Sequence, residues 1–428
     1  MNNSSDWKTQ ALGRVARLTM GQSPDSKYYS EEESGWPFLQ GCAEFQSRFP
    51  AAALYCTQKR KLGKRGSILF SVRAPVGRIN IADRDYVIGR GLAAIVGSEI
   101  DQDYLEHYLN FIMPAFRTAS QGSTFEAINS NDLNAWPIAY PSAKPEQSKA
   151  AHVLSTADRA IEHTEVLIAK QQRIKTGLMQ DLLTRGIDEH GNLRSEQTHP
   201  FKDSLLGRIP IDWEVRQLAD VLADTPRNGI YKPAGQIGSG RLLIGQTSFT
   251  HERRIDYRLS RRAEISNAEL RAYGLRDDDI LVTRVFATVA GVRRPVLVSG
   301  LPEPAVYESN ILRLRIDRNA MHPTLLFHWL LSSQMRKLIT SAVNASNQTS
   351  VNQKVLNELP VPIPPGDEQR KIVETISAQE IQLGQNENYN YKLRALKAAL
   401  MQDLLTGNKR VTPLLELEPK LENVFGRR

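Results

Sequence analysis

Basic side chains that flank turns of small residues have the types and spacing to bind an anionic polymer. The densest run is QKRKLGKR, and the segments SVRAPVGR and TRVFATVAGVRR place arginines beside glycine or proline. A lysine ammonium pairs with phosphate as a point charge, whereas the planar arginine fork also fits guanine O6 and N7. These runs predict contacts to DNA, and a solvated surface loop is the competing interpretation of each.

The candidate DNA contacts fall in both halves of the chain. In the first half they are Lys59, Arg60, Lys61, Lys64, Arg65, Arg73, Arg78, Gln121 and Ser123. In the second half they are Arg227, Asn228, Arg284, Arg293, Arg294, Gln348 and Thr349. The uncharged candidates come mainly from SQGSTF and NASNQTS, which occupy matching positions and offer polar groups to base edges or phosphates.

The motifs of the common catalytic and metal sites are missing. Gly63-Lys64 is followed by arginine and lacks the upstream glycine spacing of a phosphate-binding loop, and no Asn/Asp-Pro-Pro-Tyr/Phe methyltransferase signature occurs. The histidines show neither HExxH nor a zinc spacing, and Pro24-Asp25 has no downstream Glu-x-Lys at nuclease distance. We therefore expect no catalytic residue and no metal ligand in this chain, and binding is favoured over catalysis.

Composition limits the class of protein further. The 428 residues fit two or three domains, and the net charge of +8 with a pI near 9.3 favours an anionic partner. The two cysteines, Cys42 and Cys56, are too few for a disulfide framework and are expected to be small buried hydrophobes. The opening MNNSS is not a signal peptide and no apolar run approaches the ~20 residues of a membrane span, so a cytoplasmic protein is expected.

The chain contains an internal repeat. MQDLLT at Met179–Thr184 recurs word for word at Met401–Thr406, an offset of 222 residues. Glu146-Gln147 recurs as Glu368-Gln369 at the same offset, so the whole intervening stretch aligns without a gap. The sequence therefore predicts two similar units, each a variable module followed by a closely matched segment.

The matched segments read as two long amphipathic helices. Steps of four and three residues trace a heptad seam along each, apolar at the ends and polar in the middle, where Thr164, Gln171, Asn386 and Asn390 lie. The apolar seam residues are Leu154, Ile161, Ile168, Leu178, Leu182, Ile376, Leu383, Leu393, Leu400 and Leu404. Two ordinary long core helices are the alternative, but each segment is far longer than the ~11–12 residues of an average helix.

The connection between the units favours an antiparallel helix pair. The polar stretch 187–206 is long enough for a surface linker, whereas a parallel pair would stretch it taut over the length of a helix. The polar seam residues would fix register and orientation at some cost in stability. The expected arrangement is an antiparallel coiled coil with pseudo-twofold symmetry that acts as a spacer.

The modules themselves are expected to be α+β domains, each built on a curved, largely antiparallel sheet. Short β-rich runs such as GSILFSV and NILRLRI alternate with turns, and each module ends in a helical stretch, DYLEHYLNFIMPAFRTAS or TLLFHWLLSSQMRKLITSA. The expected boundaries are 1–141 for the first module, 142–186 for the first spacer helix, 187–206 for a linker, 207–365 for the second module, 366–407 for the second spacer helix and 408–428 for a C-terminal tail.

The positive charge is concentrated in the second module. Residues 205–365 hold 21 Lys and Arg against 15 Asp and Glu, and 18 of the 21 are arginine. The first helical segment, 146–184, is balanced. This pattern is typical of a module that binds DNA beside a helix that binds proteins.

The repeat, the helix opened by PEQSKAAHVLSTADRAIE or LPVPIPPGDEQRKIV, and the closing words LMQDLLTRGIDEHGNLR and ALMQDLLTG together resemble one family closely. The chain is similar to the specificity subunit of type I restriction-modification systems over nearly its whole length. ILFSVRAPVGRINI and RNGIYKP also look like segments of that family's target recognition domains. The first helix departs from the usual opening at YPSAKPEQ, where the second copy reads IPPGDEQ.

The resemblance implies a non-catalytic, sequence-specific DNA-binding subunit. Each module would be a target recognition domain that reads one half of a bipartite DNA sequence. The helices would set the spacer and dock two methyltransferase subunits, which use S-adenosylmethionine to methylate a flipped-out adenine. Restriction and translocase subunits using ATP and Mg²⁺ would complete the complex, whereas this chain would hold no cofactor.

Three other interpretations stay open at this point. A coiled-coil adaptor would use both modules for protein partners and bind no specific duplex. A self-sufficient restriction-methylation enzyme should show cofactor motifs, which are missing. An orphan specificity subunit would work without a nuclease partner.

Overall fold

The structure is a computed structural model, and it describes residues 6–119, 127–250, 253–283, 295–345 and 353–415. The chain divides into two compact units. The first comprises Met1–Val166 together with Glu387–Arg428, and the second comprises Leu167–Asn386. Each unit therefore holds one module and a portion of each of two long helices, α4 (Lys144–Thr184) and α9 (Gly366–Leu405).

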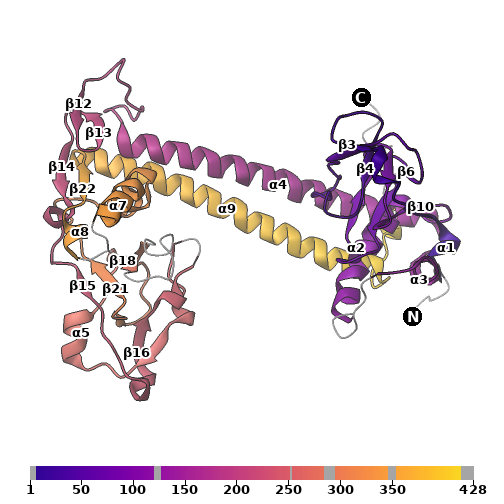
Figure 1. The fold of residues 1–428 in the computed structure, drawn as a ribbon. Coiled ribbons are helices and arrows are strands. Elements are labelled where there is room, and N and C mark those ends of the chain that lie inside the picture. Colours follow the sequence, from indigo (N-terminus) through magenta and orange to yellow (C-terminus); the bar gives the residue numbers. More distant parts are fainter. Residues whose placement is uncertain (1–5, 120–126, 251–252, 284–294, 346–352, 416–428) are drawn as a thin grey trace, which may run out of the picture. The chain divides into compact units, whose positions relative to one another are not determined.

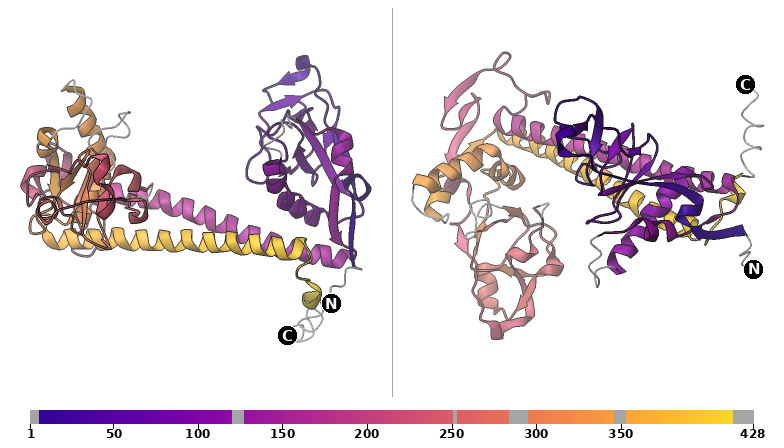
Figure 2. Two further views of the ribbon diagram at one scale, coloured as in Figure 1. Left: turned by 90° about the horizontal axis from the view of Figure 1, so that it is seen from below. Right: turned by 45° about the vertical axis from the view of Figure 1, so that its right-hand side comes forward.

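The two long helices are antiparallel, and both units show it (Figures 1 and 2). In the first unit the Asn390 amide donates to the Ile161 carbonyl over 3.2 Å, and Lys397 pairs with Asp158. In the second unit the Asn386 amide donates to the Gln171 side chain over 2.8 Å, and Lys175 pairs with Glu380 at 2.7 Å. Residue numbers fall along one helix as they rise along the other, so the predicted antiparallel pair is confirmed.

The heptad seam lies in the contact between these helices. Thr164 and Asn390 are buried, and Asn386 satisfies Gln171 across the pair, so the polar middle of the seam is hydrogen-bonded. Leu154, Ile161, Leu182, Ile376 and Leu404 are buried, whereas Ile168, Leu178, Leu383, Leu393 and Leu400 are half-buried.

The first module contains two sheets and a separate two-stranded ladder. The four-stranded sheet has the order β2 (Ala16–Met20), β10 (Leu92–Gly97), β7 (Ile68–Ser71) and β8 (Ile79–Ile81), and its pairs are antiparallel. The five-stranded sheet has the order β3 (Tyr29–Ser30), β5 (Leu54–Cys56), β4 (Trp36–Leu39), β9 (Tyr86–Ile88) and β6 (Leu62–Gly63). The ladder joins β1 (Trp7–Ala11) to β11 (Pro137–Pro141), which leads into α4.

The second module repeats this plan. Its four-stranded antiparallel sheet has the order β15 (Arg227–Asn228), β21 (Ile311–Leu314), β18 (Ile280–Thr283) and β19 (Val296–Leu297). Its second sheet has the order β17 (Arg261–Ala263), β16 (Ile237–Ile244) and β20 (Ala305–Tyr307). The ladder joins β14 (Glu214–Gln217) to β22 (Pro360–Ile363), which leads into α9.

Each module therefore differs from the expectation of one curved sheet. The second sheet of each contains one parallel pair, β4 with β9 and β16 with β20, and the other pairs are antiparallel. A parallel pair needs a crossover connection, which β-rich runs and turn signals along the chain do not reveal. The tandem α+β architecture is confirmed, since each module has a four-stranded antiparallel sheet of matching strand order and a second sheet with one parallel pair.

Shorter helices cover the sheets. In the first module they are α1 (Leu12–Val15), α2 (Gln102–Ala119) and α3 (Ser130–Ala135). In the second they are α5 (Asn267–Tyr273), α6 (Pro323–Leu331), α7 (Ser333–Ala345) and α8 (Gln353–Asn357). The expected single helix before the second long helix is thus two helices, and the Ser332 hydroxyl between them accepts the backbone N–H of Met335 over 3.1 Å, as a helix cap does.

The segment between α4 and the second module is not the plain surface linker that its polar composition indicates. It contains β12 (Phe201–Ser204), which pairs with β13 (Gly207–Pro210), and Ile187 within it is buried. Arg194 donates to both oxygens of the buried Glu368 carboxylate at 2.8 and 3.0 Å. Tertiary contacts with α9 therefore order this segment.

A related contact occurs in the first unit, beyond the end of α9. Arg410 donates to both oxygens of the buried Glu146 carboxylate, at 2.6 and 2.5 Å, and to Asp6 at 3.1 Å. Glu146 and Glu368 are the repeated glutamates at offset 222, so the same residue of each long helix holds an arginine from the segment after the other helix.

Glycines make these junctions possible. Gly186 and Gly407 follow α4 and α9 and have positive φ values of 64° and 78°. A Cβ at Gly186 would lie 2.0 Å from a Glu368 oxygen, and one at Gly407 would lie 2.9 Å from the Trp7 ring. Any other residue would strain the backbone and displace these side chains.

Two further expectations concern composition. Cys42 and Cys56 are free and buried, as predicted for small apolar side chains. Within the described ranges, no helix is both long and apolar enough to cross a bilayer.

Candidate nucleic-acid interface

The basic run of the first module surrounds the short edge strand β6. Lys59, Arg60, Lys61, Lys64 and Arg65 are all exposed. The Lys59 ammonium lies 4.5 Å from the centre of the Trp36 ring, and the Asp85 carboxylate accepts the backbone N–H of Arg65 over 2.8 Å. The backbone of the run is therefore held while its cationic groups face solvent, as contacts to phosphate require.

Arg73 and Arg78 flank the turn between β7 and β8. The buried Ser71 hydroxyl donates to the Pro75 carbonyl over 2.7 Å and accepts the Arg78 N–H over 2.8 Å. Gly77 adopts a φ of 78° inside the turn. Both arginines are exposed on a turn that the serine rigidifies.

Arg227 and Asn228 form strand β15 at the edge of the second module's four-stranded sheet. Arg227 is exposed, but its guanidinium donates to the Ala272 carbonyl at 3.1 Å. Asn228 is half-buried and its side-chain oxygen is buried with no hydrogen-bond partner in the described structure. This pair is thus less available to a groove than the basic run of the first module.

The remaining predicted contacts lie outside the described residues. They are Gln121, Ser123, Arg284, Arg293, Arg294, Gln348 and Thr349.

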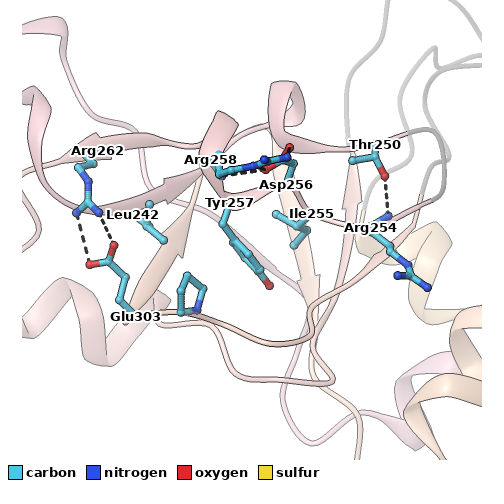
Figure 3. Close-up of a pocket in the computed structure, with 10 residues that line it drawn as sticks. Leu242, Thr250, Arg254, Ile255, Asp256, Tyr257, Arg258, Arg262 and Glu303 are labelled. Atoms are coloured by element: carbon cyan, nitrogen blue, oxygen red, sulfur yellow. Dashed lines mark hydrogen bonds and ion pairs between the residues drawn. The ribbon is translucent and has the colours of Figure 1, made fainter. Parts of the chain in front are cut away.

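A cluster of arginines in the second module was missed by the sequence reasoning. Arg254, Arg258 and Arg262 line a cavity of about 590 Å³, whose wall also includes Tyr257 and Glu303 (Figure 3). The cavity lies where β16 and β17 meet the short helical turn at Tyr257–Leu259. The sequence signal was the run HERRIDYRLSRR, which holds five arginines, as many cations as QKRKLGKR.

Acidic residues organise this arginine cluster. Asp256 binds the Arg258 guanidinium at 2.9 and 2.8 Å, and this hydrogen bonding lowers the pKa of Asp256. Arg262 pairs with Glu303, whereas Arg254 extends its guanidinium away from both acids (Figure 3). An exposed ion pair contributes little to stability, so a phosphate can compete with Asp256 or Glu303 for the arginine fork.

Not all of the arginine excess is available to a ligand. Arg313 is buried and donates to Asp224 at 2.6 Å, and Arg315 holds both oxygens of the buried Asp279 at 2.8 and 2.7 Å. These ion pairs lie within the fold because strand β21 carries Arg313 into the sheet and Arg315 follows the strand directly. The charge count of the module therefore overstates the charge of its surface.

The family of the chain follows from comparison with known proteins. A family model described as the type I restriction modification DNA specificity domain matches residues 4–171 and 298–390. The chain belongs to this family. The match covers nearly all of the first module with most of α4, and the end of the second module with most of α9. Arg254, Arg258 and Arg262 lie outside the matched ranges, whereas Glu303 of the same cavity lies inside them.

Individual specificity subunits are similar over different lengths. The MjaX specificity subunit of Methanocaldococcus jannaschii is 38% identical over 183 residues, which span 42% of this chain and 43% of that protein. The MjaVIII specificity subunit of the same organism is 22% identical over 96% of this chain and 94% of its own. The Escherichia coli EcoDI specificity subunit is 26% identical over 87% of this chain and 80% of its own.

Solved structures share the fold. A type I S subunit from M. genitalium has a TM-score of 0.60 at 15% identity, covering 94% of this chain and 97% of its own. A chain from a study of type I complex assembly has a TM-score of 0.57 at 16% identity over 95% of this chain. This specificity subunit therefore has the tandem fold of its family.

The family assignment decides the broad function. The chain is a specificity subunit that recognises the DNA target, and catalysis belongs to partner subunits of the complex. Among the residues that the structure describes, no group of three metal-ligating side chains is close enough to hold an ion.

Proposed function

We propose that each recognition domain of this specificity subunit reads one half of a bipartite DNA target. The first domain comprises 1–141 and the second comprises 207–365, with spacer helices at 142–186 and 366–407. The observation that carries the proposal is that the chain holds two modules of similar strand arrangement. Each module lies in its own compact unit, together with a portion of both long helices. A subunit with two readers of one design suits two separated half-sites.

The base and phosphate contacts in this proposal come from exposed basic groups. In the first domain these are the run around β6 with Arg73 and Arg78, and in the second they are Arg227 and the cluster of Arg254, Arg258 and Arg262. The neutral, half-buried Asn228 lies beside Arg227 and is proposed as a further contact. Salt-dependent phosphate contacts would set affinity and register, and arginine forks in the major groove would discriminate guanine.

The helix pair is proposed to dock two methyltransferase subunits. Large apolar side chains are exposed along it: Val166, Tyr389, Tyr391 and Leu396 in the first unit, and Ile174 and Ile381 in the second. Val166 and Ile381 are each 62% exposed. Apolar side chains at this exposure on a helix surface support protein contacts along both units.

The remaining components would reside on partners. Methyltransferase subunits would bind S-adenosylmethionine, and restriction and translocase subunits would bind ATP and Mg²⁺. The complex would act on double-stranded DNA in the cytoplasm. This subunit would bind none of these cofactors itself.

Co-expression with the methyltransferase of the same system, followed by single-molecule mapping of methylated adenines, tests the proposal. The expected result is one motif with two defined halves and an unspecified spacer. A stable complex with the methyltransferase that methylates no bipartite motif would refute it. A complex that methylates such a motif without a nuclease partner would instead identify an orphan specificity subunit.

A further inference from the structure

A buried histidine connects the first recognition domain to the helix pair. His107 on α2 is 2% exposed, and its Nδ1 lies 3.8 Å from Oδ2 of Asp158 on α4. Its Nε2 lies 3.0 Å from the Ser155 hydroxyl, also on α4. Lys397 on α9 forms an ion pair with the same Asp158. Three elements therefore meet at one carboxylate.

The second unit contains a matching set of a histidine, a carboxylate and a lysine. His328 on α6 is 3% exposed, and its Nε2 lies 3.8 Å from Oε1 of Glu380 on α9. Lys175 on α4 donates to this oxygen at 2.7 Å. Again the domain supplies the histidine, the helix that follows the domain supplies the carboxylate, and the other long helix supplies the lysine.

The two sets occupy repeated positions. Asp158 and Glu380 are 222 residues apart, as are Lys175 and Lys397, which is the offset of the repeat. The histidines lie within LEHYL and LFHWL and are 221 residues apart, one residue fewer than the offset of the helices. A single buried polar contact has many explanations, but the same contact built twice indicates a shared role.

Both histidines are uncharged at neutral pH. Burial lowers the pKa of His107 to about 4, with Lys397 and Arg48 acting in the same direction and Asp158 opposing. Burial likewise lowers the pKa of His328 to about 4, against the effect of Glu380. In each set the neutral imidazole ring lies beside a carboxylate whose charge is balanced by the lysine. The carboxylate and the lysine therefore form an ion pair next to a buried, uncharged histidine.

Such a set gives directional information that apolar packing lacks. Apolar side chains tolerate small rotations of one helix on another, because van der Waals contact has little directional preference. A carboxylate paired with a lysine on the opposite helix has a defined position on the helix pair. The histidine of the domain must then lie beside that carboxylate with a ring nitrogen directed toward it. Buried polar groups fix register and orientation in helical assemblies in the same way.

We propose that each histidine–carboxylate–lysine set, His107–Asp158–Lys397 and His328–Glu380–Lys175, is the positioning contact that fixes its recognition domain on the helix pair. The consequence is a single permitted spacer length between the two half-sites. This inference rests on the proposed bipartite recognition. It assigns the choice of spacer to the domain–helix junctions as well as to the length of the helices.

The test uses the complete methyltransferase complex with His107→Leu or His328→Leu in the specificity subunit. Methylation mapping should return the same bases in both half-sites. The share of methylated sites whose spacer is one base pair longer or shorter should rise about fivefold, the order of effect for losing one modest orienting contact. Combining both substitutions should broaden the spacer further.

Two controls separate positioning from general loss of stability. Ile88→Val and Ile311→Val each remove a methyl group from a fully buried side chain in a domain sheet, away from the helix pair. They should lower the melting temperature and leave the spacer unchanged. Asp158→Glu gives the first set the carboxylate of the second and should retain the spacer preference, whereas Asp158→Leu should relax it.

A second pair of variants covers the case in which a histidine variant fails to assemble. Lys397→Gln and Lys175→Gln change half-buried lysines and leave both histidines in place, and the same broadening of the spacer is expected. An unchanged spacer in every histidine and lysine variant that assembles would overturn the inference while the bipartite motif stands. Absence of any bipartite motif in the wild-type complex would instead refute the proposed function.

Discussion

At the scale of single residues, buried ionisable groups mark where separate parts of each unit meet. Glu368 accepts hydrogen bonds from the Ile187 backbone at 2.9 Å, from the Trp213 indole at 3.0 Å and from Arg194. Burial raises the pKa of Glu368, and these hydrogen bonds oppose that change. A buried charge is tolerated only with such partners, so these residues connect the end of α4, the second domain and the start of α9.

The two buried histidines predict a loss of stability in mild acid. Their folded-state pKa values of about 4 lie below the ordinary value of 6.5, so the unfolded chain binds protons more readily between these limits. Stability should therefore be fully present above pH 6.5 and should fall as the pH drops toward 4, by roughly 3 kcal/mol per histidine at most. Urea unfolding from pH 4 to 8 measures this slope.

Charged groups around each histidine also change its pKa, so the pH dependence must be measured against a variant that lacks both histidines. Asp158, Lys397 and Arg48 face His107, and Glu380 and Lys175 face His328. Glu368 has the opposite effect on the pH dependence of stability, because its raised pKa makes the folded state bind a proton at a higher pH than the unfolded state. The wild type must therefore be compared with a His107→Leu/His328→Leu variant, whose stability should depend less on pH in this range. Equal slopes would show that the histidines are not buried as described.

The arginine cavity makes a prediction about DNA affinity. Arg254→Gln combined with Arg258→Gln should weaken binding of target and non-target duplex alike if both arginines contact phosphates, because phosphates carry no base identity. The slope of log K against log salt should fall by about 0.9 per lost contact. Arg173→Gln, an exposed arginine on α4, changes net charge outside the domain and should leave the slope unchanged. Fluorescence anisotropy at several salt concentrations decides between these results.

At the scale of elements, α4 and α9 are continuous helices whose seam is apolar toward the ends and polar in the middle. The polar middle is paired across the helices in each unit, through Asn390 in the first and through Asn386 with Gln171 in the second. Such pairs reduce stability relative to leucine but select one register. The register in turn aligns the carboxylates with the lysines of the positioning contacts.

Lengthening both helices by one heptad at their polar middle should change the spacer alone. Seven residues add about 10 Å of helix, which corresponds to about three base pairs of DNA. Methylation mapping should find both half-sites intact with a longer spacer. Inserting the heptad into α4 only is the matched control, because it misaligns the seam and should abolish assembly of the complex. An unchanged spacer after both insertions would show that the helices do not set it.

At the scale of the whole molecule, the chain is two copies of one unit, and the four-stranded sheets of the two domains have matching strand orders. The two domains differ in charge, because the second is rich in arginine. Arg313 and Arg315 of that domain, however, form ion pairs within its fold with Asp224 and Asp279. The five-stranded sheet of the first domain corresponds to a three-stranded sheet in the second. Two recognition domains with a similar fold but different surfaces are consistent with a DNA target whose two halves differ in sequence.

Exchanging one domain tests the division of labour. Replacing 207–365 with the corresponding domain of another family member should change one half of the methylated motif and preserve the other half and the spacer. The reciprocal exchange of 1–141 is the control and should change the opposite half. Changes in both halves after a single exchange would contradict independent reading by the two domains.

Much of this architecture can be predicted from the sequence because the repeat and the heptads are local patterns. MQDLLT at one offset, the heptad seam and the length of the connection at 187–206 are enough to predict two long antiparallel helices. The arginine cavity and the histidine contacts are harder to predict, since their members are far apart in the chain. LEHYL and LFHWL carried a signal for the histidines, but neither word shows that its histidine meets a carboxylate.

The sequence by itself determined the tandem repeat, the helix pair and the resemblance to specificity subunits, because these depend on periodicity and on words that recur at fixed spacing. Only the tertiary structure decided which charges remain exposed. Arg313 is as cationic in the sequence as Arg258, yet the fold buries one beside Asp224 and leaves the other at a cavity. The physical reason is that burial and ion pairing depend on contacts between residues distant in the chain, which composition and spacing do not encode.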